Sequence, residues 1–229
     1  MIFLHENAGN IGLRMDYFEI LYKHLEVNIV AIAYRGYSGS EGSPSEPGLI
    51  MDAAAAVDFC KKEPRINDEK VFLCGRSLGG AVAVHLAAEM SQKEDFYFNG
   101  VIIESTFTSI SDMADQVFPF LTKLPCGIKE KMTKLKWKSI EKVPTIKTPL
   151  LYISGDKDSF VPTWMTQLLY DKSTEAPIRE ILLVPGGEHN NTFQVAGSSY
   201  TSTLSSFFSK CKNHYSRGLD EKEIKVTDK

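Results

Sequence analysis

The sequence contains no long hydrophobic run and no excess of basic residues. No stretch of about 18 apolar residues occurs among its 229 residues and no signal peptide is recognisable, so we predict no membrane-spanning segment. Lysine and arginine number 26 against 29 aspartates and glutamates, which gives a net charge of -3. Because the chain has no overall basic character of the kind that binds phosphate backbones, we do not expect it to bind nucleic acid.

Cysteine is scarce, and its placement indicates neither disulfides nor a metal site. The four cysteines, Cys60, Cys74, Cys126 and Cys211, show no paired spacing and no pattern of metal ligands. Reduced thiols are typical of intracellular proteins. We therefore expect an intracellular, cytoplasmic protein that uses no metal and no organic cofactor. A membrane surface is a possible partner, and an N-terminal anchor outside this sequence would attach the protein to a membrane.

What the sequence does contain is a regular alternation of apolar and helical segments. Apolar runs predict strands near residues 2–5, 28–34, 70–75, 100–104, 149–154 and 180–184. Helical patterns lie between them, near residues 13–25, 48–62, 78–90, 162–172 and 198–211. This alternation predicts an α/β fold in which helices cover both faces of a mostly parallel sheet. Residues 1–213 are expected to form a single domain, and the charged tail at 214–229 is expected to be disordered.

A serine between two glycines marks the first candidate site. The motif Gly75-Arg76-Ser77-Leu78-Gly79 follows an apolar strand and precedes a run of small, helix-forming residues. A sharp strand-to-helix turn lifts a serine hydroxyl above the sheet, and flanking glycines let neighbouring backbone approach closely. The helix N-terminus would direct N–H groups toward negative charge that develops at the serine. Taken alone, the motif fits a nucleophile and a tight turn equally well.

Candidates for a base and an orienting acid follow Ser77 along the chain. Asp156 and Asp158 come just after the apolar run 149–154, and His189 comes just after the run 180–184. Open parallel sheets place their sites at this carboxyl edge, and Ser, Asp, His is the triad order of alpha/beta-hydrolases. The histidine would take the serine proton, and the carboxylate would orient the imidazole. These residues leave open whether Asp156 or Asp158 is the acid.

The first apolar run ends at His5, where such folds place a loop that contributes to the oxyanion hole. We expect the hole to consist of the backbone N–H of Leu78, next after the nucleophile, and that of Asn7. His5 itself is expected to brace the loop. The remaining histidines have patterns typical of packing or surface residues: His24, His85 and His214.

Five separated motifs resemble the alpha/beta-hydrolase domain-containing protein 13 subgroup of the alpha/beta-hydrolase superfamily, with its fungal bud-emergence and plant wavy-growth relatives. They are HENAGNIG at 5–12, YRGYSGSEG at 34–42, GRSLGGAVA at 75–83, ESTFTSI at 104–110 and HNNT at 189–192. The resemblance implies an alpha/beta-hydrolase fold. It also implies the acid, because the family pattern Gly-x-x-Asp-x-x-Val-Pro, here Gly155 to Pro162, has the triad acid at its fourth position. The implied triad is Ser77, Asp158 and His189.

Two features depart from that subgroup. Most relatives have glycine after the first histidine, whereas this chain has Glu6. A carboxylate aimed at the oxyanion hole would oppose negative charge there, so we predict that Glu6 points away from Ser77. Relatives also have an anchoring helix and two strands ahead of the strand that ends at His5, and the fold expected here lacks these first two strands. The strand within 27–34 would then be an apolar sheet edge, which predicts poor solubility or self-association.

The segment 111–143 lies where hydrolases of this fold insert lids. It begins with apolar residues around Phe118 and continues with seven lysines against two glutamates. One interpretation is a lid whose apolar face meets an acyl chain while its lysines meet an anionic membrane surface. We favour the other, a connector with solvated lysines, because lysine-rich faces are usually solvated.

Together these observations predict a serine hydrolase of carboxylic esters or thioesters that forms an acyl-enzyme. Its substrate would be a small acyl ester or an acylated protein. A serine peptidase or an acyl-protein thioesterase of the depalmitoylase type would use the same residues. A noncatalytic scaffold would keep the fold without the chemistry.

Overall fold

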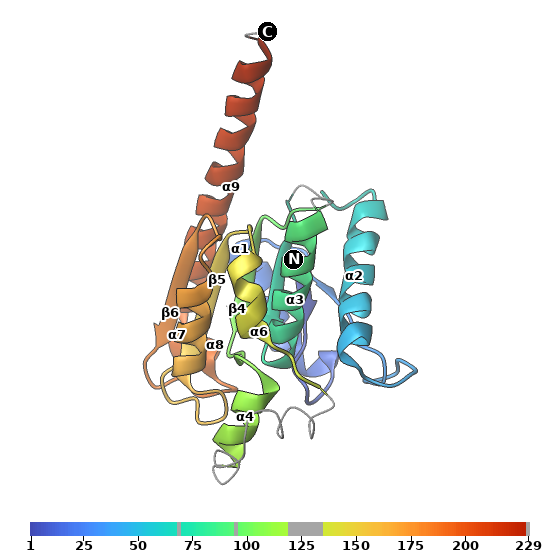
Figure 1. Cartoon of the computed structure of the whole chain (residues 1–229), viewed down its shortest axis with the longest axis vertical. Helices are drawn as coiled ribbons and strands as arrows, with labels where there is room; N and C mark the ends of the chain where they lie inside the picture. Colours follow the sequence, from blue (N-terminus) through green and yellow to red (C-terminus); the bar gives the residue numbers. More distant parts are fainter. Residues whose placement is uncertain (68–69, 94–95, 119–134, 228–229) are drawn as a thin grey trace.

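The chain forms one parallel sheet with helices on both faces (Figure 1). The computed structural model describes residues 1–67, 70–93, 96–118 and 135–227, with side chains as far as Tyr215. The strand order is β2-β1-β3-β4-β5-β6, and every neighbouring pair is parallel, as the sequence predicts. The strands are β1 (Ile2–Leu4), β2 (Val30–Ala31), β3 (Phe72–Arg76), β4 (Gly100–Glu104), β5 (Leu150–Gly155) and β6 (Arg179–Val184).

Alternate residues of the central strands enter two different cores, because successive side chains of a strand point to opposite faces of the sheet. In β1, Ile2 and Leu4 pack into the core on one face and Phe3 into the core on the other. In β3, Leu73 joins the first core and Cys74 the second. Since both faces are buried, these strands are almost uninterrupted apolar runs, which is why the sequence reveals them.

Helices α2, α3, α6 and α7 contribute to the first core, and α1 and α9 contribute to the second. All predicted helices are present; α4, α6 and α8 are short helices that the sequence analysis does not predict. A cap explains the start of α4, because the Ser109 hydroxyl accepts the backbone N–H of Asp112. The helices are α1 (Met15–Leu25), α2 (Glu46–Lys62), α3 (Leu78–Lys93), α4 (Ile110–Val117), α6 (Ser139–Lys142), α7 (Thr163–Lys172), α8 (Thr192–Ala196) and α9 (Ser198–Thr227), with 3-10 turns η1 (Ile11–Arg14) and η4 (Val143–Thr145).

Strand β2 forms one edge of the sheet, as predicted, but it is much shorter than the predicted strand at 28–34. Its partner β1 has only three residues, and their register gives pairing partners to Val30 and Ala31 alone. The far side of β2 has no neighbouring strand in the described part of the chain. Met15, which lies along this edge, is 60% exposed.

Helix α9 extends well beyond the rest of the molecule (Figure 1). It runs to Thr227, so residues 214–227, which the composition predicts to be disordered, are helical here. The tail contains helix formers with opposite charges four residues apart, such as Glu221 and Lys225, and this spacing favours helix. None of the helices in the described ranges is both long enough and apolar enough to cross a membrane.

The segment 111–143, for which a connector is favoured over a lid, has α4 near its start and α6 near its end. Its central residues, 119–134, lie outside the described residues, and so do four of its seven lysines. Of the other three, Lys136 and Lys142 are exposed, and the Lys138 ammonium pairs with Glu141 at 3.0 Å.

Candidate active site

Ser77 lies in the sharp turn between β3 and α3. Its φ of 52° is in the left-handed region that residues other than glycine rarely adopt. A Cβ at Gly75 would lie 2.2 Å from the carbonyl oxygen of Gly79, and one at Gly79 would lie 2.0 Å from that of Leu4. Neither position has room for a side chain, so the two glycines allow the close backbone packing that surrounds the serine.

The structure brings Ser77, His189 and Asp158 together from three different strand ends. His189 Nε2 lies 3.2 Å from Ser77 Oγ, and His189 Nδ1 lies 2.8 Å from Asp158 Oδ2. An ionised carboxylate only accepts hydrogen bonds, so Nδ1–H donates to Asp158 and Nε2 is left free to accept the serine proton. The Asp158 side chain is fully buried and the His189 side chain is 16% exposed, so the base can be reached from solvent and the acid cannot.

The two aspartates that the residues alone could not separate have different partners. Asp158 Oδ1 accepts the backbone N–H groups of Phe160 and Val161 at 3.0 and 2.8 Å, which leaves Oδ2 to face His189. Asp156 Oδ1 accepts the backbone N–H of Gly186 at 2.7 Å. Asp156 therefore closes the contact between the two loops, and Asp158 is the acid that meets the histidine.

The main chain of Ser77 is held by the end of β4. The Ser77 N–H donates to the Glu104 carbonyl at 2.9 Å, and the Thr106 hydroxyl donates to the Ser77 carbonyl at 2.7 Å. Because both backbone groups of Ser77 have partners in neighbouring segments, its strained conformation is held in place from outside the turn.

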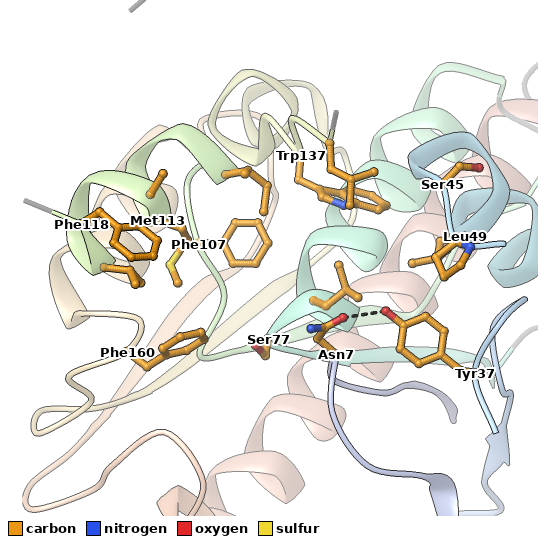
Figure 2. Close-up of a pocket in the computed structure, with 16 residues that line it drawn as sticks. Asn7, Tyr37, Ser45, Leu49, Ser77, Phe107, Met113, Phe118, Trp137 and Phe160 are labelled. Atoms are coloured by element: carbon orange, nitrogen blue, oxygen red, sulfur yellow. Dashed lines mark hydrogen bonds between the residues drawn. The ribbon is translucent and has the colours of Figure 1, made fainter. Parts of the chain in front are cut away.

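Asn7 and Leu78, the two expected oxyanion donors, both line the cavity into which Ser77 opens. Neither backbone N–H has a backbone acceptor among the described residues. The Tyr37 hydroxyl donates to Asn7 Oδ1 at 2.6 Å, as Figure 2 shows, and so ties the Asn7 side chain to a neighbouring residue of the cavity wall. Leu78 is the first residue of α3, where the helix N-terminus adds a partial positive charge.

The cavity above Ser77 has a volume of about 400 Å³ and predominantly apolar walls. Figure 2 shows Met113, Phe118 and Phe107 on one side of Ser77 and Tyr37 on the other. Phe160 lies at the His189 end, where its ring meets the imidazole edge-to-face at 5.0 Å. The main apolar lining residues are Phe107, Ile110, Met113, Val117, Phe118 and Trp137.

Comparison with known proteins identifies the family, because residues 48–214 match the prolyl oligopeptidase family. The chain belongs to the prolyl oligopeptidase family of alpha/beta-hydrolases. It is 37% identical over 218 residues to alpha/beta hydrolase domain-containing protein WAV2 of Arabidopsis thaliana. The aligned region covers 92% of this chain and 70% of WAV2. It is 34% identical over 211 residues to protein bem46 of Schizosaccharomyces pombe, and this aligned region covers 92% of this chain and 67% of bem46. The predicted resemblance is thus confirmed.

A solved structure supports the fold independently. The chain of esterase Pf2001 from Pyrococcus furiosus superimposes with a TM-score of 0.72 at 21% sequence identity, which covers 91% of this chain and 81% of that one. At this identity the likeness shows the fold alone. The predicted alpha/beta-hydrolase fold is confirmed.

The other histidines of this alpha/beta-hydrolase do not contact Ser77. His5 is buried, with Nδ1 2.6 Å from the Glu6 carbonyl and its ring against those of Tyr34 and Tyr37. This position allows His5 to brace the Asn7 loop. The remaining three lie elsewhere: His24 on α1, His85 buried within α3 and His214 on α9.

The three cysteines within the described residues form no disulfide. Cys60, Cys74 and Cys211 are buried free thiols, and Cys126 lies outside the described residues. Burial raises the pKa of the Cys74 thiol to about 12. Among the side chains that the structure describes, no group of three His, Cys, Asp or Glu residues could hold a metal ion.

Glu6 is buried, and its carboxylate faces two guanidinium groups instead of the cavity. Its Oε2 accepts a 2.9 Å hydrogen bond from Arg14 Nε, and its Oε1 lies 3.2 Å from Arg76 Nη1. Arg76 stands in the serine motif itself, but the motif alone predicts no role for it. Its position at the end of a buried strand was the available signal, because a buried arginine requires partners.

Proposed function

We propose that this chain is a serine hydrolase that cleaves a carboxylic ester or thioester through an acyl-enzyme. The observation that carries the proposal is the continuous contact from Ser77 through His189 to Asp158 at the floor of an apolar cavity. A strained serine beside an accepting Nε2, with a buried carboxylate behind the ring, has the geometry of an activated nucleophile.

Each step uses groups that are already in place. Ser77 Oγ attacks the acyl carbon while His189 Nε2 takes its proton, and the Asn7 and Leu78 N–H groups stabilise the oxyanion. The bond to the leaving group breaks as His189 returns that proton to the departing alcohol or thiol. Water then attacks the acyl carbon and gives a proton to His189. The proton passes to Ser77 Oγ as the acid is released.

The cavity favours an apolar acyl group. Burial of a methylene is worth about 0.8 kcal/mol, so kcat/KM should rise by up to about fourfold for each methylene that enters the cavity. A series of p-nitrophenyl esters of increasing chain length measures this slope. A steady preference for acetate over longer acyl groups would contradict an acyl role for the cavity.

Labelling with a fluorescent fluorophosphonate tests the nucleophile directly. Wild type should be labelled and Ser77→Ala should not, with circular dichroism to establish that both are folded. Ser105→Ala is a matched control, because Ser105 is also buried with a positive φ of 46°, but its hydroxyl has no hydrogen-bond partner among the described residues. Absence of labelling in the folded wild type would favour the noncatalytic scaffold.

Membership of the prolyl oligopeptidase family favours a second candidate, a serine peptidase. The same residues would attack a peptide amide, with His189 protonating the leaving amine. Parallel assays of an ester and a peptide amide with the same acyl group separate the two activities. A higher kcat/KM for the amide would replace the ester proposal by the peptidase.

A further inference from the structure

Two loops of the candidate active site and the end of strand β4 meet at the buried guanidinium of Arg76. Arg76 is 6% exposed and directly precedes Ser77. Its Nη2 donates a 2.6 Å hydrogen bond to the backbone carbonyl of His189. Its Nη1 lies 3.2 Å from Glu6 Oε1, and its Nε lies 3.6 Å from Glu104 Oε1. One side chain thus contacts the loop after β1, the end of β4 and the loop after β6.

We propose that Arg76 is a positioning residue that holds the oxyanion loop, the nucleophile and the base in register. The proposal rests on the hydrolase function proposed above. Arg76 directly precedes Ser77 in the chain. Its ion-pair partner Glu6 directly precedes Asn7, and its hydrogen bond goes to the backbone carbonyl of His189. The guanidinium is planar and rigid, so its hydrogen bond to the His189 carbonyl and its ion pairs with the Glu6 and Glu104 carboxylates together restrict the relative positions of these partners.

Both carboxylates beside Arg76 are held at their second oxygen. Glu104 Oε2 accepts a 2.7 Å hydrogen bond from the Tyr200 hydroxyl, and Glu6 Oε2 accepts the bond from Arg14. Although burial alone lowers it, the pKa of Arg76 is raised by the charges of Glu104 and Glu6. The guanidinium therefore remains charged. The Glu104 and Glu6 carboxylates are each fixed by a hydrogen bond to the oxygen that does not face Arg76.

His189 needs such support because its main chain belongs to the loop between β6 and α8. Asp158 orients the imidazole through Nδ1, whereas Arg76 fixes the peptide unit from which the side chain extends. A misplacement of about 1 Å in a catalytic group can cost about 100-fold in rate. Two independent attachments, one at the ring and one at the backbone, restrict that displacement.

Arg76→Lys tests the inference, because lysine keeps the charge but cannot fork to three partners. We expect kcat to fall about 10-fold to 100-fold while KM changes less than about threefold, since Arg76 does not line the cavity. Arg35→Lys is the matched control: Arg35 Nη2 pairs with Asp52 at 2.7 Å, and the hydrogen bonds of the Arg35 side chain within the described residues go to Asp52 and to none of the triad residues, so kcat should be unchanged. Equal kcat in wild type and Arg76→Lys would overturn the proposal.

Proton NMR provides a readout that does not require turnover. The downfield resonance of the His189 Nδ1–H that bonds Asp158 should weaken or shift in Arg76→Lys and stay in place in Arg35→Lys. A folded wild type that hydrolyses no ester would defeat the proposed function alone, and the resonance would still test Arg76. An unchanged resonance in Arg76→Lys would overturn the positioning role. If that variant does not fold, the double variant Arg76→Gln/Glu6→Gln removes one buried charge of each sign, and the same two outcomes apply to it.

Discussion

Replacement of Asp158 by asparagine should nearly abolish hydrolysis while leaving the fold intact. The change is isosteric, and the amide oxygen of the introduced side chain can still accept the two backbone N–H groups that Oδ1 now accepts from Phe160 and Val161. The amide NH2 would then face His189 Nδ1. The amide NH2 and the Nδ1–H of His189 are both donors and cannot bond each other. The imidazole would therefore adopt the tautomer that has its proton on Nε2. That tautomer cannot accept the Ser77 proton.

The structure sets an upper limit on the residual activity. A flipped amide would offer its oxygen to His189, but it would turn its NH2 toward two buried N–H donors. Each unsatisfied donor costs about 1–3 kcal/mol, so the flip costs at least about 2 kcal/mol and is populated to no more than about 3%. Wrong-tautomer variants of such triads lose about 10,000-fold in kcat. We therefore expect kcat of Asp158→Asn between about 0.01% and 3% of wild type.

The assay is kcat for ester hydrolysis near neutral pH, with thermal unfolding measured on the same samples. Asp156→Asn is the matched control from the same loop, because its amide oxygen can still accept the Gly186 N–H, and the carboxylate bonded to His189 Nδ1 is that of Asp158. Its kcat should stay within about threefold of wild type. Asp158 is not the orienting acid if Asp158→Asn retains more than about a tenth of wild-type kcat, or if Asp156→Asn loses as much activity as Asp158→Asn.

Two further predictions concern stability and association. Burial lowers the pKa of His85 from 6.5 to about 4. Between these pH values the unfolded chain binds more protons than the folded chain, so the free energy of unfolding should fall by about 3 kcal/mol as the pH drops from 6.5 to 4. Urea unfolding at the two pH values should show this loss in wild type and a smaller one in His85→Phe; the same loss in both would assign it to other groups. The open β2 edge and the exposed Met15 predict self-association at tens of micromolar, which Met15→Lys should reduce in light scattering. A monomeric wild type at that concentration would contradict the second prediction.

The parallel sheet, its main helices and the chain order of the site residues follow from local patterns in the sequence. Buried parallel strands are nearly continuous apolar runs, and the Ser77 turn requires glycine where backbone segments approach closely. Strand ends also mark the places where site residues must gather, because all strands of this sheet are parallel and share one carboxyl edge. Ser77 and His189 could therefore be named before their distance was known.

Which groups meet across that edge depends on the packing of segments that are distant in the chain. From the residues alone Asp156 and Asp158 were equivalent, and only the resemblance to a family separated them. In the fold, backbone N–H groups hold Asp158 Oδ1 so that Oδ2 faces His189, whereas Asp156 Oδ1 accepts the N–H of Gly186. The partners of Arg76 come from separate loops and strands, so their contacts depend on strand register, which residue types do not encode locally. The length of β2 likewise depends on its short partner β1. The cavity walls come from separate helices and loops, so no single segment of the sequence predicts the cavity.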